Sequence, residues 1–400
     1  MIAHDQEYSE LVSQTDVAMR MLGWVESDPG GADTLEGLIS EYDGRTPPAP
    51  AQTPGIVLLT SGTTGTPKGA PRHAGRSLAP LGAMLSKVPF RARERTHVAA
   101  PMFHALGLAQ MTITLGVGSA VVVQRRFKAE TALDLVERHS CSGLTVVPVM
   151  LSRMVTLLEQ EPARFDLKAL RIVLVAGSQL EAELARRSLR AFGDKIYNYY
   201  GSTEVAWATI ATPADLRAAP GCCGRAPFGT VVRLYDDDGR PLADRTKIGR
   251  IFVGNGFQFE GYTGGGTKEV IDGLMSTGDV GHFDAGSRLF IDGRDDDMIV
   301  SGGENLFPGE VEELLATHPG IQEASVIGVD DAEFGKRLAA YVVLREGADA
   351  LSADDVKEFV RANLARFKVP RDVEFLDELP RNPTGKVLKR QLRERHALSE

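Results

Sequence analysis

A run of ten residues rich in hydroxyl groups and glycine has the composition of a phosphate-binding loop. It covers residues 60–69 and reads Thr-Ser-Gly-Thr-Thr-Gly-Thr-Pro-Lys-Gly. Glycines let the backbone approach an anion closely, hydroxyl groups donate hydrogen bonds, and Lys68 adds positive charge. The run is not a Walker A loop, because Pro67 stands between the last internal glycine and the lysine. A flexible Gly/Thr connector has the same composition.

The residues on either side of this loop favour phosphate binding over a connector. Apolar residues 56–59 predict a buried strand before the loop, and apolar side chains between 81 and 88 recur at helical spacing after it. A strand, a loop and a helix in this order are typical of nucleotide-phosphate sites. We therefore predict that the loop binds phosphate.

Six further polar motifs follow the loop along the chain. They are MFHALG at 102–107, YGSTE at 200–204, STGD at 276–279, GRDDD at 293–297, SGGEN at 301–305 and PTGK at 383–386. In this order, the seven motifs resemble those of the adenylate-forming superfamily, which includes acyl-CoA synthetases, adenylation domains of peptide synthetases and luciferases. The resemblance covers nearly the whole chain, and the run 261–281 most resembles actinobacterial fatty-acid–CoA ligases.

This resemblance implies a two-step ligase reaction. A carboxylic acid attacks the α-phosphorus of ATP to give acyl-AMP and pyrophosphate, and the acyl group then passes to the thiol of CoA with release of AMP. Charge that builds up at phosphorus must be neutralised by cations and donors fixed in place. The implied cofactors are ATP, Mg²⁺ and CoA.

The resemblance also assigns the nucleotide site. It assigns the leaving phosphates to Thr60, Ser61, Gly62, Thr63, Thr64 and Lys68. It assigns the adenosine to Gly177, Ser178, Asn198, Tyr200, Gly201, Thr203, Asp279 and Arg294. Asp279 and Arg294 match the ribose-binding pair, since a carboxylate can accept from two neighbouring hydroxyl groups. A surface ion pair and an ordinary core tyrosine are the alternatives for this pair and for Tyr200.

Three residues match the family's catalytic positions. Lys386 follows a turn-forming segment that can place its ammonium against the carboxylate and the α-phosphate. Glu204 matches a glutamate that acts through Mg²⁺. His104 matches a gate of the acyl pocket. A solvated lysine, a solvated glutamate and a satisfied core histidine are the respective alternatives.

Two further motifs match the family's moving parts. Asp296 matches a hinge, about which a small domain rotates between the two half-reactions. Gly302 and Gly303 match the passage for the pantetheine arm of CoA, which must be free of side chains. A simple turn is the alternative for the glycine pair.

The residues near the expected acyl pocket favour an apolar acid. No aspartate lies between 98 and 124 to pair with a substrate ammonium, and residues 146–151 are apolar. We therefore predict a fatty or aryl acid, with a fatty acid preferred.

Composition excludes several other functions. The 400 residues include 54 acidic and 45 basic side chains, for a formal charge of −9, so no basic surface for nucleic acid or an anionic membrane is expected. Three cysteines make no disulfide framework, and the N-terminus has no signal-peptide pattern, which favours the cytoplasm. The uncharged stretch 98–124 could span a bilayer, but prolines and glycines interrupt it and favour a buried helix and strand.

Alternating strand and helix patterns predict an α/β fold. Residues 143–189 alternate between apolar runs and helical periodicity, as in layers with strands buried on both faces. Short strands joined by tight turns at 231–253 predict a β-rich subdomain.

Past Arg294 the pattern becomes that of a small α+β domain, in which Ser352 and Asp355 predict a helix-capping box. We predict a large domain over 1–295, a hinge at Asp296 and a mobile domain over 297–400.

Two other functions stay open at this point. Family members carry a longer stretch before the phosphate loop, so the chain is expected to lack the first portion of the large domain. It could then be a truncated, catalytically weak protein that binds nucleotide or acyl groups. Alternatively, it could be an acyl-AMP ligase that loads a separate acyl-carrier protein. A homo-oligomer is also left open.

Overall fold

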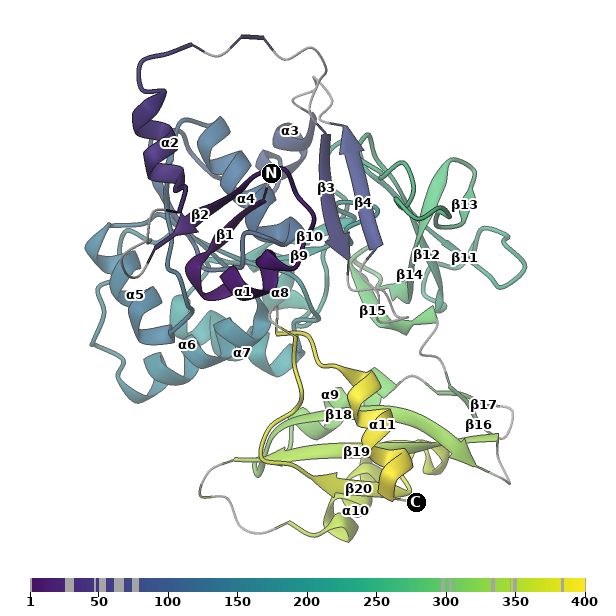
Figure 1. The fold of residues 1–400 in the computed structure, drawn as a ribbon. Helices are drawn as coiled ribbons and strands as arrows, with labels where there is room; N and C mark the ends of the chain where they lie inside the picture. The colour runs from purple at the N-terminus through teal and green to yellow at the C-terminus, as the bar shows by residue number, and fades with distance from the viewer. Residues whose placement is uncertain are drawn as a thin grey trace. The chain divides into compact units, whose positions relative to one another are not determined.

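The computed structural model describes residues 2–25, 32–46, 48–49, 55–60, 68–73, 79–295, 299–301, 304–306, 308–331, 335–345, 347, 351–382 and 385–399. The chain divides into two compact units, Met1–Pro54 and Gly55–Glu400, and each is described by itself (Figure 1).

The first unit is a small α/β element. Its two strands, β1 (Ile2–Asp5) and β2 (Arg20–Trp24), pair in parallel. The helices are η1 (Gln6–Tyr8), α1 (Ser9–Ser13) and α2 (Leu35–Glu41). Helix α2 begins where the Thr34 side chain accepts a hydrogen bond from the backbone N–H of Gly37, a typical N-cap. This unit contains no predicted site residue.

The second unit contains a six-stranded sheet. Its strands, in spatial order, are β10 (Thr209–Ala211), β9 (Ile196–Tyr200), β8 (Ile172–Val175), β7 (Gly143–Val146), β5 (Arg95–Val98) and β6 (Ala120–Val122). All pair in parallel except β10, which is antiparallel to β9. Every residue of β7 and β8 is buried, as expected for parallel strands covered on both faces.

Helices cover both faces of this sheet and bury two hydrophobic cores. One core packs against α5 (Ala129–Arg138), α6 (Pro148–Gln160), α7 (Ala182–Phe192) and α8 (Pro213–Ala218). The other packs against α3 (Ala79–Leu85) and α4 (Ala105–Gly116). The predicted α/β layering is confirmed. Likewise, stretch 98–124 forms α4 and β6, and in the described part of the chain no helix combines the length and apolar character needed to cross a membrane.

An antiparallel sheet forms the predicted β-rich subdomain. Its strands are β11 (Val231–Tyr235), β12 (Gly249–Gly254), β14 (Leu274–Phe283), β13 (Val270–Ile271) and β15 (Leu289–Arg294). The core of this subdomain also receives Ala70, which belongs to a separate hairpin of β3 (Gly55–Thr60) and β4 (Lys68–His73).

This hairpin adds a strand to the expected order of strand, loop and helix. The helix predicted from the apolar spacing between 81 and 88 is present as α3, but residues 68–73, between the loop and this helix, form β4. Strand β4 pairs with β3 along its whole length, from Thr60↔Lys68 to Gly55↔His73. Cross-strand pairing of this kind depends on non-local contacts, and the sequence analysis did not predict it.

The C-terminal part has the predicted α+β character. Its sheet has the order β18 (Ile321–Asp331), β19 (Gly335–Leu344) and β20 (Asp372–Phe375), beside a hairpin of β16 (Ile299–Ser301) and β17 (Glu304–Leu306). The helices are α9 (Pro308–Ala316), α10 (Ala353–Asn363), η3 (Arg366–Lys368) and α11 (Lys389–Ser399). The capping box of Ser352 and Asp355 is present at the start of α10. Asp296 lies outside the described residues, so the hinge and the domain boundary there remain predictions.

Candidate functional site

Tyr200, Asp279 and Arg294 meet at one carboxylate. Asp279 of β14 and Arg294 of β15 are cross-strand partners, and Arg294 Nη1 donates to Asp279 Oδ1 at 3.1 Å. The hydroxyl of Tyr200, at the carboxyl end of β9, donates to Asp279 Oδ2 at 2.6 Å. The predicted ribose pair, Asp279 and Arg294, is therefore brought together with Tyr200, which was predicted to contact the adenine, from two sheets.

Burial dominates the electrostatics of this cluster. It raises the pKa of the Asp279 carboxyl, while Arg294, the Tyr200 hydroxyl and the Lys386 ammonium offset part of that increase. Burial and the neighbouring Asp279 also hold the pKa of Tyr200 well above its ordinary value, so Tyr200 stays a neutral donor. A carboxylate that accepts these two bonds keeps lone pairs for the hydroxyl groups of a ligand.

Gly278 leaves room for two cations beside this carboxylate. Its φ of +78° lies in the left-handed region that favours glycine. A Cβ at this position would lie 3.2 Å from both Arg294 Nη2 and Lys268 Nζ. Lys268 was missed by the sequence analysis, because no predicted function was attached to the segment that carries it.

Glu204 lies in a tight loop after β9. A Cβ on Gly201 would lie 2.0 Å from the carbonyl oxygen of Ala206, so glycine is required where the loop closes. Ser202 Oγ accepts from the backbone N–H of Glu204 at 3.2 Å. The Glu204 carboxylate accepts a hydrogen bond from the hydroxyl of Tyr262 at 2.8 Å, which no sequence motif indicated. Thr203 belongs to the same turn.

The other predicted adenosine contacts differ in their surroundings. Gly177 and Ser178 are exposed just after β8, and Gly177 has a φ of +102°. Asn198 is buried, and its amide donates to the carbonyl of Cys222 at 3.0 Å. That amide therefore braces the chain at Cys222, and its contact with a base remains a prediction.

His104 is the N-cap residue of α4. Its backbone is extended, and its side chain makes no capping hydrogen bond. It is partly buried, and its ring centroid lies 4.5 Å from that of Phe103, which is 66 % exposed. Burial lowers the pKa of His104, which keeps the imidazole neutral near pH 7. Among the described residues the ring has no hydrogen-bond partner, unlike a satisfied core histidine.

Lys386 stands on a braced turn between β20 and α11. Its backbone N–H donates to Asn382 Oδ1 at 3.0 Å, and its carbonyl accepts from the Asn382 N–H at 2.9 Å. Arg381 donates to the carbonyl of Gly385 at 2.5 Å and pairs with Glu323. The Lys386 side chain itself is exposed. Arg381, which the sequence analysis missed, therefore fixes the backbone that presents this lysine.

The phosphate loop joins the two strands of the β3–β4 hairpin, where Thr60 and Lys68 form the last described backbone pair. The backbone N–H of Thr263 donates to the Gly69 carbonyl at 2.9 Å. Seven predicted residues lie outside the described residues and remain predictions: Ser61, Gly62, Thr63, Thr64, Asp296, Gly302 and Gly303.

Metal binding would depend on Glu204 and the nucleotide together. Within the described ranges, no three His, Cys, Asp or Glu side chains form a ready-made metal site. A single carboxylate that shares Mg²⁺ with nucleotide oxygens is a common arrangement for this ion. Glu204, at the end of the parallel sheet, fits this role.

The three cysteines are buried and unpaired. Burial raises the pKa of both Cys141 and Cys222 to about 11. Burial also raises the pKa of Cys223 far above its ordinary value. A thiol nucleophile must be a thiolate, so these side chains do not suit covalent catalysis near pH 7.

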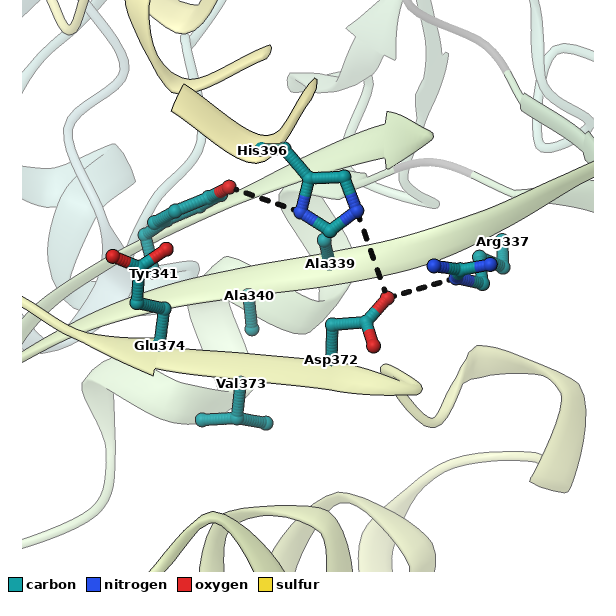
Figure 2. Close-up of a pocket in the computed structure, with 8 residues that line it drawn as sticks. All are labelled: Arg337, Ala339, Ala340, Tyr341, Asp372, Val373, Glu374 and His396. Carbon is teal, nitrogen blue, oxygen red and sulfur yellow. Dashed lines mark hydrogen bonds and ion pairs between the residues drawn. The ribbon is translucent and has the colours of Figure 1, made fainter. Parts of the chain in front are cut away.

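A cavity of about 200 Å³ lies between β19, β20 and α11 (Figure 2). His396 lies between Tyr341 and Asp372, with Nδ1 3.3 Å from the Tyr341 hydroxyl and Nε2 3.9 Å from Asp372 Oδ2. Arg337 Nε donates to the same Asp372 oxygen at 2.8 Å. The separation of Nε2 from Asp372 is longer than a hydrogen bond, and no predicted site residue lines the cavity, so we assign the cavity to the packing of α11.

Comparison with known proteins identifies the family. The model of the AMP-binding enzyme family matches residues 3–263, and that of the AMP-binding enzyme C-terminal domain matches residues 310–386. The indoleacetate–CoA ligase of Aromatoleum aromaticum is 34 % identical over 377 residues, which are 92 % of this chain and 73 % of that protein. The fatty acid–[acyl-carrier-protein] ligase ScoC of Streptomyces coeruleorubidus is 33 % identical over 354 residues, 86 % of this chain and 67 % of that protein.

Solved structures agree with this relationship. The anthranilate CoA ligase AuaEII in complex with anthranoyl-AMP superposes with a TM-score of 0.86 at 26 % identity, over 99 % of this chain and 78 % of that one. ATP-bound MatB from Rhodopseudomonas palustris superposes with a TM-score of 0.82 at 28 % identity. The match covers 97 % of this chain and 80 % of that one. These matches confirm the predicted superfamily and fold class, and the chain belongs to the AMP-binding enzyme family.

Proposed function

We propose that the protein uses ATP to convert a carboxylic acid into an acyl-AMP and then transfers the acyl group to the thiol of CoA. The observation that carries this proposal is the Asp279 carboxylate, which is held by Tyr200 and Arg294 at the end of the parallel sheet. Ligands of open parallel sheets bind at the carboxyl ends of the strands. A buried carboxylate with spare lone pairs at this edge suits a ribose diol.

The residues around this carboxylate divide the first half-reaction among them. Lys386, whose ammonium acts electrostatically on Asp279, would approach the α-phosphate and the attacking carboxylate and stabilise the charge that develops there. The hydroxyl-rich loop and Lys68 would hold the departing pyrophosphate. Mg²⁺, when bound at Glu204, would neutralise charge on the phosphate oxygens.

The pocket for the acid is proposed beside His104 and the start of α6. Val147, the N-cap residue of α6, and Met150, in the first turn of this helix, are both buried. A neutral His104 next to Phe103 presents an aromatic surface rather than a charge. These contacts support an apolar acid, for which a fatty acid is our first choice and an aryl acid our second. Relatives named for indoleacetate, sulfoacetate and ferulate show how widely the acid varies.

An acyl-carrier protein is the second candidate for the acceptor. One relative is named as a fatty acid–[acyl-carrier-protein] ligase. In that case, acyl-AMP would form with the same residues and the thiol would come from a separate protein.

Pyrophosphate release with a panel of fatty and aryl acids, followed by mass spectrometry with and without CoA, tests both candidates. Acid-dependent release together with acyl-CoA supports the CoA ligase. Acyl-AMP that accumulates in the presence of CoA supports the carrier-loading enzyme. No release with any acid would contradict both, and would favour a protein that only binds nucleotide or acyl groups.

A further inference from the structure

The segment 255–269, between β12 and β13, contacts several parts of the site. The side-chain amide of Asn255 donates to the carbonyls of Val205 and Trp207 at 2.7 and 2.8 Å. The backbone N–H of Phe259 donates to the Glu204 carbonyl at 2.8 Å. The loop that carries Glu204 is therefore held along its length by one segment.

Within this segment, Tyr262 reaches the Glu204 carboxylate itself. Its hydroxyl lies 2.8 Å from Glu204 Oε1. Its ring packs edge-on against the buried Phe259, with centroids 4.8 Å apart. A tyrosine hydroxyl is neutral near pH 7, so it donates its proton to the carboxylate at this distance.

The hydrogen bond from Tyr262 occupies only one of the two oxygens of the Glu204 carboxylate. One hydrogen bond uses one lone pair of the carboxylate, and Oε2 stays available to a cation. A glutamate that ligates a metal is more effective when an outer hydrogen bond fixes its orientation.

The next residue links this carboxylate to the phosphate hairpin. The backbone N–H of Thr263 donates to the Gly69 carbonyl at 2.9 Å, and a Cβ on Gly69 would lie 2.7 Å from Thr263 Oγ1. Consecutive residues thus hold Glu204 on one side and the base of the phosphate loop on the other.

We propose that Tyr262 is a positioning residue that orients Glu204 toward Mg²⁺ bound with the nucleotide. This inference rests on the proposed function, because it takes Glu204 as the residue that faces the metal. Tyr262 acts through Glu204 and does not itself contact the reacting atoms.

Tyr262→Phe tests the proposal, since it removes the hydroxyl and keeps the ring against Phe259. Loss of an outer partner of a metal ligand weakens metal binding by roughly 10-fold or more. We expect the Mg²⁺ concentration for half-maximal pyrophosphate release to rise by about 10-fold, with the maximal rate largely recovered at high Mg²⁺. Binding of Mn²⁺ to the complex with a non-hydrolysable ATP analogue, followed by water-proton relaxation, should weaken by the same factor.

Tyr235→Phe is the matched control. Tyr235 donates to Asp272 Oδ2 at 3.0 Å in the same subdomain, and its ring lies 4.8 Å from that of Phe252. This variant loses an equivalent tyrosine–carboxylate bond away from the site, so its metal dependence should match that of the unchanged protein. Glu204→Asp, which withdraws the carboxylate from Tyr262 while keeping its charge, gives a second test and should also need more Mg²⁺.

A double-mutant cycle separates this inference from the proposed function. If Tyr262 acts through Glu204, adding Tyr262→Phe to Glu204→Gln should cause no further loss of metal binding. Tyr262→Phe with unchanged metal dependence, in a protein where Glu204→Gln shifts it, would overturn the role of Tyr262 and leave the proposed function standing. Unchanged metal dependence in Glu204→Gln itself would overturn the assignment of Glu204 and this inference with it.

Discussion

The hydroxyl of Tyr200 and the carboxylate of Asp279 lie 2.6 Å apart, although the two residues belong to different sheets. Tyr200 ends β9 of the parallel sheet, and Asp279 lies in β14 of the antiparallel sheet. The bond therefore joins the α/β core to the β-rich subdomain at the edge where a ligand of the parallel sheet is expected. Substitutions at this junction should affect nucleotide binding more than folding.

Asp279→Asn should weaken ATP binding by about 10- to 100-fold, because a hydrogen bond to a charged group contributes roughly 1.5–3 kcal/mol. The amide can still accept from Tyr200, but it no longer neutralises Arg294 or binds a ribose diol with full charge. Titration calorimetry with ATP measures the change. Asp272→Asn, which alters the acceptor of Tyr235 in the same subdomain, is the control and should bind ATP normally. Normal ATP affinity in Asp279→Asn would contradict the assignment.

The sequence predicted Asp279, Arg294 and Glu204 because each lies in a short motif. It did not reveal Tyr262, since the bond to Glu204 spans 58 positions and leaves no local pattern. The same limit explains why the strand at residues 68–73 was not predicted. Their pairing with β3 is set by the hairpin and by the burial of Ala70 in another subdomain's core, whereas periodicity reports only local structure.

Lys386→Ala should slow acyl-AMP formation by about 100-fold or more, the scale at which a fixed electrostatic donor contributes to catalysis. Thioester formation from supplied acyl-AMP should be affected much less, since the lysine serves the phosphate chemistry of the first step. Pyrophosphate release and acyl-AMP consumption measure the two steps separately. Lys389→Ala is the control, because Lys389 lies in α11 and pairs with Glu312 at 3.1 Å. Equal losses in both steps would count against the role of Lys386.

Lys268→Ala should raise the KM for ATP several-fold with a smaller effect on kcat. Lys268 Nζ and Arg294 Nη2 would both lie 3.2 Å from a Cβ on Gly278, so two cations face the same space. Within the described residues Lys268 makes no ion pair, which leaves its charge for an anionic ligand. Steady-state kinetics at varied ATP measure the effect. Lys247→Ala, at a surface turn of the same subdomain, should keep the normal KM; an equal change in both variants would contradict a local role for Lys268.

Glu181→Gln should change how stability depends on pH. Burial raises the pKa of Glu181 from its usual 4.5 to about 7, and the carboxylates of Glu312, Glu313 and Glu323 add to this shift while Arg381 opposes it. A group with a raised folded-state pKa contributes stability that is fully present at low pH and is lost as pH rises through the folded value. For Glu181, that loss develops from about pH 4.5 to beyond pH 7.

Glutamine cannot ionise, so the Glu181→Gln variant avoids this loss of stability at higher pH. The difference in thermal midpoint between the variant and the unchanged protein should therefore grow in favour of the variant from about pH 5 to pH 8 and level off above it. Scanning fluorimetry across this range measures the difference. Glu183→Gln is the control, since Glu183 lies two residues farther along α7 and pairs with Arg186 and Arg190 at the surface. A constant difference from pH 5 to pH 8 would mean that folding does not raise the pKa of Glu181.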